Sequence, residues 1–185
     1  MRKLILLMLI FFQIGFTQSF DKTKLDNYFN WIENSNRFMG NIAVSKDGEI
    51  IYLKSIGYAD ISNNLKATKE TKYRIGSISK SFTATLVLKA IENKKLELNQ
   101  TIDKWFPMIK DSDKITIKQL LSHRSGIYNF TDNLNYLTWN TQKKTEKEMV
   151  ETITMGGNSF APDSKAEYSN SNYLLLSYIL EKTFM

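Results

Sequence analysis

The sequence predicts an α/β fold of the α+β kind, in which a helical region accompanies an antiparallel sheet. Three observations lead to this prediction. Apolar residues recur at helical spacing in several segments, an Asp-Gly turn signal separates two β-rich segments, and hydrophobic residues make up 42% of the 185 residues. This length and apolar content suit one domain with a hydrophobic core and exclude a disordered chain.

The first predicted elements are a helix and a β-hairpin. The helix is expected over residues 21–34, because its apolar side chains are spaced three and four residues apart: Leu25, Tyr28, Phe29 and Ile32. The β-rich segments 41–45 and 49–58 flank Lys46-Asp47-Gly48, where Asp-Gly favours the positive φ angles of a tight turn. We therefore expect two antiparallel strands, with the helix packed on their sheet.

The remainder of the chain is predicted to be mainly helical. A short strand at residues 73–75 leads through a glycine into a helix over residues 77–93. Three more helices are expected at residues 115–122, 146–153 and 170–182, joined by loops rich in Asn, Thr, Ser and Gly.

Residues 1–19 have the order of a signal peptide: two cationic residues, a 13-residue apolar run over residues 4–16, and small polar residues. The alternative is a transmembrane anchor, but a span needs about 20 apolar residues. We expect cleavage between Thr17 and Ser19. The sequence thus predicts an exported protein, periplasmic or extracellular, without a stable membrane anchor.

Composition narrows the possible chemistry. The chain has no Cys, which excludes disulfides and thiolate ligands, and its one histidine, His123, leaves no His/Cys metal cluster. We expect no metal and no cofactor. The formal net charge is +6, nearer +4 without residues 1–19, and the lysines form no long basic block. We therefore expect no nucleic-acid partner.

A lysine lies on the apolar face of the predicted helix over residues 77–93. Helical periodicity places Lys80 on one face with Ser77, Ala84, Val87, Leu88 and Ile91. Lys89 lies on the opposite face, with polar residues. Burial would favour the neutral amine of Lys80, the form that acts as a base.

Ser77 precedes Lys80 by three residues, so an amine can reach the serine hydroxyl one turn away. The N-terminus of a helix also favours the negative charge that develops when a hydroxyl loses its proton. This pattern indicates an activated serine. In the alternative, Ser77 only caps the helix and Lys80 extends into solvent.

Three segments resemble elements of one enzyme superfamily, the serine β-lactamases and penicillin-binding proteins. The likeness is greatest to the class C branch, with its D,D-peptidases and esterases. Residues 73–83 resemble the nucleophile segment of that superfamily. Residues 120–126 resemble the loop after its second helix, and residues 168–173 resemble its Tyr-x-Asn element, 91 residues after Ser77.

The resemblance implies a role for each matching residue. Ser77 would be the acylated nucleophile, Lys80 the group that accepts or relays its proton, Tyr168 the phenol that shares this work, and Asn170 the residue that orients the substrate amide. A phenol with an ordinary pKa of about 10 needs a nearby cation for this task. His123 is not a catalytic position in the superfamily, so we expect a turn residue that bonds nearby backbone groups.

One element of the superfamily has no match. Its Lys/His-Thr/Ser-Gly segment lies on a strand that supplies the second oxyanion donor, whereas Lys182-Thr183-Phe184 lacks the glycine and follows Asn170 by only 12 residues. We expect residues 20–185 to be the N-terminal part of a β-lactamase-like domain, with an incomplete sheet and no activity alone.

The function predicted from the sequence is that of an exported serine hydrolase. It would form an acyl-enzyme with a small-molecule or peptide substrate: a β-lactam, a D-alanyl peptide or a small ester. The alternative is a non-catalytic β-lactamase-like protein that binds a cell-wall peptide or a partner.

Overall fold

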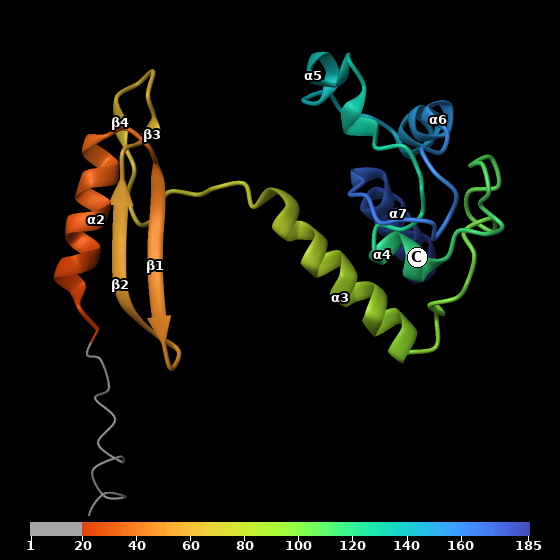
Figure 1. The fold of residues 1–185 in the computed structure, drawn as a ribbon, viewed down its shortest axis with the longest axis horizontal. Helices are drawn as coiled ribbons and strands as arrows, with labels where there is room; N and C mark the ends of the chain where they lie inside the picture. Colours follow the sequence, from red (N-terminus) through yellow and green to blue (C-terminus); the bar gives the residue numbers. More distant parts are fainter. Residues whose placement is uncertain (1–19) are drawn as a thin grey trace, which may run out of the picture. The chain divides into compact units, whose positions relative to one another are not determined.

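The structure, a computed structural model, describes residues 20–185, so the predicted signal peptide at residues 1–19 lies outside the described part. The chain divides into two compact units, one ending at Arg74 and the other running from Ile75 to Met185. The first unit holds a helix and two hairpins, and the second is mainly helical (Figure 1).

The first unit begins with α2 (Lys22–Asn34), for which the Asp21 carboxylate provides the N-cap by accepting a hydrogen bond from the Lys24 N–H. Strands β1 (Gly40–Lys46) and β2 (Glu49–Ile56) pair antiparallel. Between them Asp47 and Gly48 have φ angles of 53° and 86°. The predicted hairpin and its turn are confirmed.

Helix α2 packs against β2, as predicted, and Figure 1 shows the helix beside the hairpin. Tyr52 of β2 is only 2% exposed, its ring stacks on Phe29, and its hydroxyl donates to Asp26 Oδ1 at 2.9 Å. Tyr28, expected on the packed face, is exposed instead. A second small hairpin follows, formed by β3 (Tyr58–Asp60) and β4 (Leu65–Lys66).

The predicted strand at residues 73–75 is wrong. Within residues 20–185 no strand pairs with this segment, and its last residue, Ile75, has helical backbone angles where the chain enters the next turn. The helix after it also starts later than predicted. Gly76, at φ 51°, opens the 3₁₀ turn η1 (Gly76–Ile78), and helix α3 runs over Ser79–Glu92.

Three further helices of the second unit agree closely with the predicted segments: α4 (Ile117–Leu121), α6 (Glu146–Gly156) and α7 (Asn170–Phe184). The unit also has a short helix, α5 (Tyr136–Trp139), which was not predicted, and a 3₁₀ turn η2 (Phe130–Asp132). Capping boxes at Thr116 and Thr145 fix where α4 and α6 begin, so α4 starts two residues later than expected. None of the described helices has the length and apolar character needed to cross a membrane.

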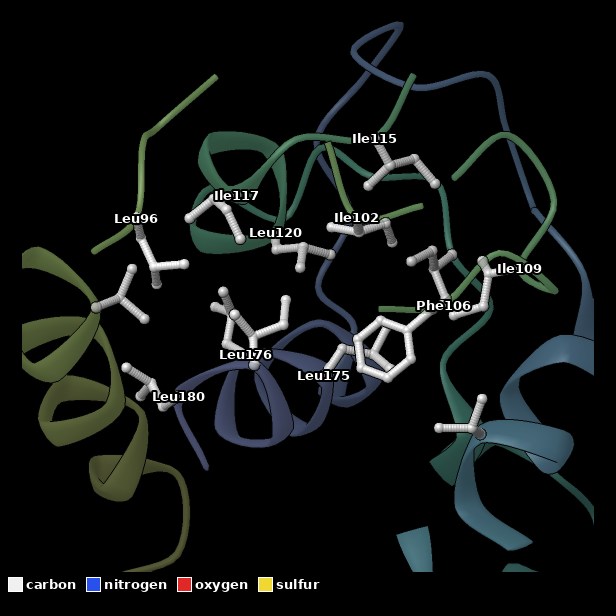
Figure 2. Close-up of a cluster of buried hydrophobic side chains, with 14 of the residues drawn as sticks. Leu96, Ile102, Phe106, Ile109, Ile115, Ile117, Leu120, Leu175, Leu176 and Leu180 are labelled. Carbon is white, nitrogen blue, oxygen red and sulfur yellow. The ribbon is translucent and has the colours of Figure 1, made fainter. Parts of the chain in front are cut away.

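Helix α7 is central to the core of the second unit and contacts α3, α4 and α6. Figure 2 shows Leu175, Leu176 and Leu180 of α7 among buried side chains from other segments: Leu96, Ile102, Phe106, Ile109, Ile115, Ile117 and Leu120. Helix α3 adds Val87 and Ala90 to this core. Leu88, on the apolar face predicted to carry Lys80, is 54% exposed. The burial fixes α7 beside α3 and α4.

Candidate active site

Ser77 lies in η1, immediately before α3, and its side chain is exposed to solvent. The positive φ of Gly76 turns the chain into this position. Lys80 lies in the first turn of α3, and its Nζ donates a hydrogen bond to Ser77 Oγ at 3.2 Å. The predicted Ser-Lys contact is present, and a substrate can reach the hydroxyl.

Tyr168 and Asn170 come to the same place from the N-terminus of α7. The Tyr168 hydroxyl lies 2.9 Å from Ser77 Oγ, and Lys80 Nζ donates to Asn170 Oδ1 at 2.8 Å. Tyr168 also donates to Asn170 Oδ1 at 3.3 Å. The four side chains that the sequence marked as site residues thus form one hydrogen-bonded cluster within the second unit.

The hydrogen bonds in this cluster have a direction. Lys80 has only donors, so it occupies a lone pair of Ser77 Oγ and one of Asn170 Oδ1. Tyr168 in turn donates to Asn170 Oδ1, and in that arrangement the serine hydroxyl is the donor to the Tyr168 oxygen. Once Tyr168 is ionised, its oxygen lies within reach of that serine proton.

The surroundings of Tyr168 favour its phenolate. Hydrogen bonding with Lys80 is the largest cause that lowers the pKa of Tyr168 below its usual value, and hydrogen bonding with Ser77 comes next. Burial acts in the opposite direction, and the positive charge of Lys80 adds to the lowering. Lys80 Nζ also lies 5.0 Å from the centre of the Tyr168 ring.

Lys80 is not the buried lysine that helical periodicity predicted. Its side chain is half-buried, and polar groups of Ser77 and Asn170 face its Nζ. The prediction failed because the first turn of α3 lies at the end of the core, where α7 presents polar side chains. Within this cluster, Lys80 lies between hydrogen-bond acceptors.

Two residues that sequence reasoning missed hold Asn170 in place. Asn129 Oδ1 accepts hydrogen bonds from the Asn170 backbone N–H at 2.9 Å and from its Nδ2 at 3.3 Å. Thr131 Oγ1 accepts from the same Nδ2 at 3.1 Å. These bonds orient the carboxamide so that its oxygen faces Lys80. No spacing pattern marks either residue in the sequence.

His123 is a turn residue, as predicted. Its backbone has φ 56°, its carbonyl accepts from the Glu167 N–H, and its Nδ1 accepts from the Ser169 N–H at 3.2 Å. Its ring centre lies 4.6 Å from that of Tyr168 and 5.2 Å from that of Tyr173. His123 thus bonds the backbone next to Tyr168.

Comparisons with known proteins agree with this geometry. A family model described as Beta-lactamase matches residues 33–184. A teichoic acid D-alanine hydrolase of Staphylococcus aureus is 30% identical over 159 residues, which are 86% of this chain and 37% of that protein. The chain therefore spans little more than a third of the length of this curated relative.

Superpositions on solved structures agree with the family match. The crystal structure of FmtA from Staphylococcus aureus superposes with a TM-score of 0.72 at 27% identity, covering 88% of this chain and 44% of that one. The D-amino acid amidase from Ochrobactrum anthropi SV3 gives a TM-score of 0.73 at 28% identity, covering 85% and 44%. Together with the family match over residues 33–184, these likenesses show that the chain belongs to the Beta-lactamase family, among hydrolases related to penicillin-binding proteins.

Proposed function

We propose that the chain carries the nucleophile and the proton-transfer groups of a serine hydrolase that works through an acyl-enzyme on D-amino-acyl esters and amides. One observation carries this proposal: Ser77 Oγ lies between Lys80 Nζ at 3.2 Å and the Tyr168 hydroxyl at 2.9 Å. A hydroxyl between a cation and a phenol can lose its proton to the phenolate as it attacks.

In the acylation step, Ser77 Oγ forms a bond to the substrate carbonyl carbon while its proton passes to the Tyr168 phenolate. The phenol then gives this proton to the leaving alcohol or amine as the carbonyl carbon releases it. In deacylation, water attacks the Ser77 ester, Tyr168 takes a proton from the water, and the proton returns to Ser77 Oγ as the acid departs.

Lys80 and Asn170 support this proton transfer. The ammonium of Lys80 stabilises both the phenolate and the developing negative charge on Ser77 Oγ. The carboxamide oxygen of Asn170 accepts from Lys80 and, while the phenol carries its proton, from Tyr168. Orienting a substrate amide, the role implied by the superfamily, stays part of the proposal for Asn170. The Ser77 N–H, in the first turn of a helical segment, is the candidate oxyanion donor of this chain.

The relatives suggest the substrate class. By their names, the teichoic acid D-alanine hydrolase and the D-amino acid amidase both act on compounds that contain a D-amino acid. We place D-alanyl esters and D-amino acid amides ahead of β-lactams as substrates. A formal net charge nearer +4 without residues 1–19 also suits an anionic wall polymer as the carrier of such esters.

Export completes the proposal. The cationic, apolar and small-polar order of residues 1–19 supports cleavage between Thr17 and Ser19, which would remove most of this segment from the mature protein. N-terminal sequencing of protein recovered outside the cytoplasm checks this. A mature N-terminus between residues 18 and 20 agrees, whereas an intact Met1 in that fraction contradicts it.

Hydrolysis by the full-length gene product tests the function. The panel contains D-alanine methyl ester, D-phenylalanine amide, their L-enantiomers and a chromogenic cephalosporin. We expect turnover of the D-compounds that Ser77→Ala abolishes and Ser79→Ala, the matched control in the same segment, retains. Equal rates for D- and L-compounds would contradict the substrate class. Binding of the D-compounds without any turnover would favour the non-catalytic alternative.

A further inference from the structure

A chain of buried hydrogen bonds leads from the loop after α4 to the His123 ring. The Ile127 N–H donates to Ser125 Oγ at 3.1 Å, so the hydroxyl proton of Ser125 is free to donate to Asn172 Oδ1, at 2.6 Å. Ser125 and Asn172 are both buried. Because its oxygen faces Ser125, Asn172 turns its Nδ2 toward His123 Nδ1, at 3.4 Å.

Two N–H donors therefore face one nitrogen of the His123 ring. One is Asn172 Nδ2, and the other is the backbone N–H of Ser169, at 3.2 Å from Nδ1. A ring nitrogen that accepts from two donors carries no proton, so the neutral His123 has its proton on Nε2. Protonation of Nδ1 would make its N–H face these two N–H donors, so both hydrogen bonds to Nδ1 would break.

The residue held by this nitrogen is next to Tyr168. Ser169 follows Tyr168 directly and is the N-cap residue of α7, but its side chain makes no capping bond. The His123 ring also packs against the Tyr168 ring, with centres 4.6 Å apart. The imidazole thus bonds the backbone N–H of Ser169, the residue after Tyr168, and packs against the Tyr168 ring.

We propose that neutral His123 is a positioning residue that holds the Tyr168 hydroxyl on Ser77, and that protonation of its Nδ1 releases this hold and reduces activity at acidic pH. The proposal rests on the function proposed above, in which Tyr168 accepts the proton of Ser77. His123 touches neither substrate nor Ser77 in this scheme and acts only through Tyr168.

The charged and titratable groups around the imidazole favour its neutral form. Lys80 of α3 brings a positive charge, and Tyr168 and Tyr173 are the titratable groups that face the ring from α7 and the segment before it. Burial lowers the pKa of His123 below its ordinary value, the charge of Lys80 lowers it further, and the hydrogen bond with the Ser169 backbone acts in the opposite direction without reversing this lowering. The ring is therefore neutral at neutral pH and gains its charge only below its ordinary pKa.

The charged residues next to His123 in its own loop and in the segment before Tyr168 do not stabilise a charged imidazole. The Arg124 guanidinium pairs with Asp163. The Glu167 carboxylate pairs with Lys165, and only the Glu167 backbone N–H contacts His123, at its carbonyl. No carboxylate among these residues bonds the imidazole and stabilises its charged form.

Two substitutions at position 123 separate the ring acceptor from the backbone. The φ of 56° suits Asn and Gly, so neither His123→Asn nor His123→Gly strains the turn. Asn can place its side-chain oxygen where Nδ1 lies and does not titrate. We expect His123→Asn to retain kcat within about threefold at pH 8, and His123→Gly to lose about 10²-fold in kcat with little change in KM, because Tyr168 is misplaced.

The pH profile separates positioning from a merely structural role. Both Tyr168 and His123 must be unprotonated, so log(kcat/KM) in the wild type should rise with a slope of about two at low pH. In His123→Asn the slope should fall to about one, the part that belongs to Tyr168. Added imidazole should partly restore His123→Gly. An unchanged slope in His123→Asn would overturn the proposal.

NMR, which needs no substrate, tests directly whether Nδ1 of His123 is unprotonated. The given sequence has one histidine, and comparing ¹⁵N-histidine NMR spectra of the untagged full-length gene product and of its His123→Asn variant assigns the signals of His123. We expect the Nε2–H tautomer at neutral pH and a pKa below the usual value. The Nδ1–H tautomer would overturn the proposal. If the protein shows no Ser77-dependent turnover, the proposed function fails, while this spectrum still decides whether Nδ1 is the acceptor.

Discussion

The Tyr168 hydroxyl lies 2.9 Å from Ser77 Oγ, although 91 residues separate the two along the chain. The contact depends on the packing of α7, whose buried leucines hold its N-terminus beside the start of α3. Ser77 comes from the turn before α3 and Tyr168 from the segment before α7. The core of the second unit therefore sets the geometry of the candidate site.

Removing the phenol hydroxyl should reduce activity with little effect on the fold. Tyr168 is 50% exposed, so Tyr168→Phe removes no buried group, and loss of a general base typically costs about 10²–10⁴ in rate. Tyr173→Phe is the matched control. It loses a hydrogen bond to the Leu121 carbonyl, so it should lower stability by about 1 kcal/mol and leave kcat within a few-fold.

Replacing Lys80 tests whether its charge serves the chemistry. Lys80→Met should abolish acylation, because Ser77 and Tyr168 lose their cation, while the midpoint of thermal unfolding stays near that of the wild type. Lys89→Met, on the exposed opposite face of α3, should keep full activity. If Lys80→Arg retained full activity and Lys80→Met unfolded, Lys80 would be a structural cation.

The pH dependence of the wild type should report the lowered pKa of Tyr168. A group whose pKa is lowered reaches its unprotonated form at a lower pH, so the rise of kcat/KM that belongs to Tyr168 should have its midpoint below pH 10, the ordinary pKa of a phenol being about 10. In Tyr168→Phe the residual kcat/KM should no longer show this rise with pH. If kcat/KM of Tyr168→Phe still rose with pH at the same midpoint, another group would be the base.

The two residues that hold Asn170 should matter unequally. Asn129→Ala removes the acceptor of both the Asn170 backbone N–H and its Nδ2, so it should cost about 1–2 kcal/mol of stability and reduce kcat. Thr131→Val removes a single bond and should have a smaller effect on both. Urea unfolding and steady-state kinetics measure the two quantities. Equal and negligible effects would show that Asn170 needs neither partner.

The core of the second unit gives a prediction on stability alone. Leu176 of α7 is fully buried, so Leu176→Ala should lower the free energy of unfolding by about 2–5 kcal/mol. Leu88→Ala is the control, since Leu88 is largely exposed, and should change it by about 0.5 kcal/mol or less. Urea unfolding distinguishes the two. A large loss for Leu88→Ala would mean that this face of α3 is covered.

Elements with local signals were predictable from the sequence. The Asp47-Gly48 turn and the capping boxes at Thr116 and Thr145 depend on neighbouring residues alone, and all three shape the structure as such signals predict. The strand at residues 73–75 failed because a strand also needs a partner. Periodicity placed Leu88 on an apolar face but does not show what packs on that face, and in the structure Leu88 is largely exposed.

The candidate site was predictable only in part, for the same reason. The spacing of Ser77 and Lys80 is local, whereas Tyr168 and Asn170 came from the resemblance of their segment to a superfamily element. Asn129 and Thr131 contact Asn170 across about 40 residues of sequence and belong to no matching segment. Only the fold brings them to the site.

The central claim is that Ser77 is the nucleophile, and mapping a trapped acyl-enzyme tests it most directly. The full-length gene product is mixed with D-alanine methyl ester or a penicillin, quenched rapidly in acid, and digested for mass spectrometry. We predict one adduct, on Ser77, which Ser77→Ala eliminates and Ser79→Ala retains. An adduct on Ser79, Ser81 or Ser125, or one that survives in Ser77→Ala, would contradict the account.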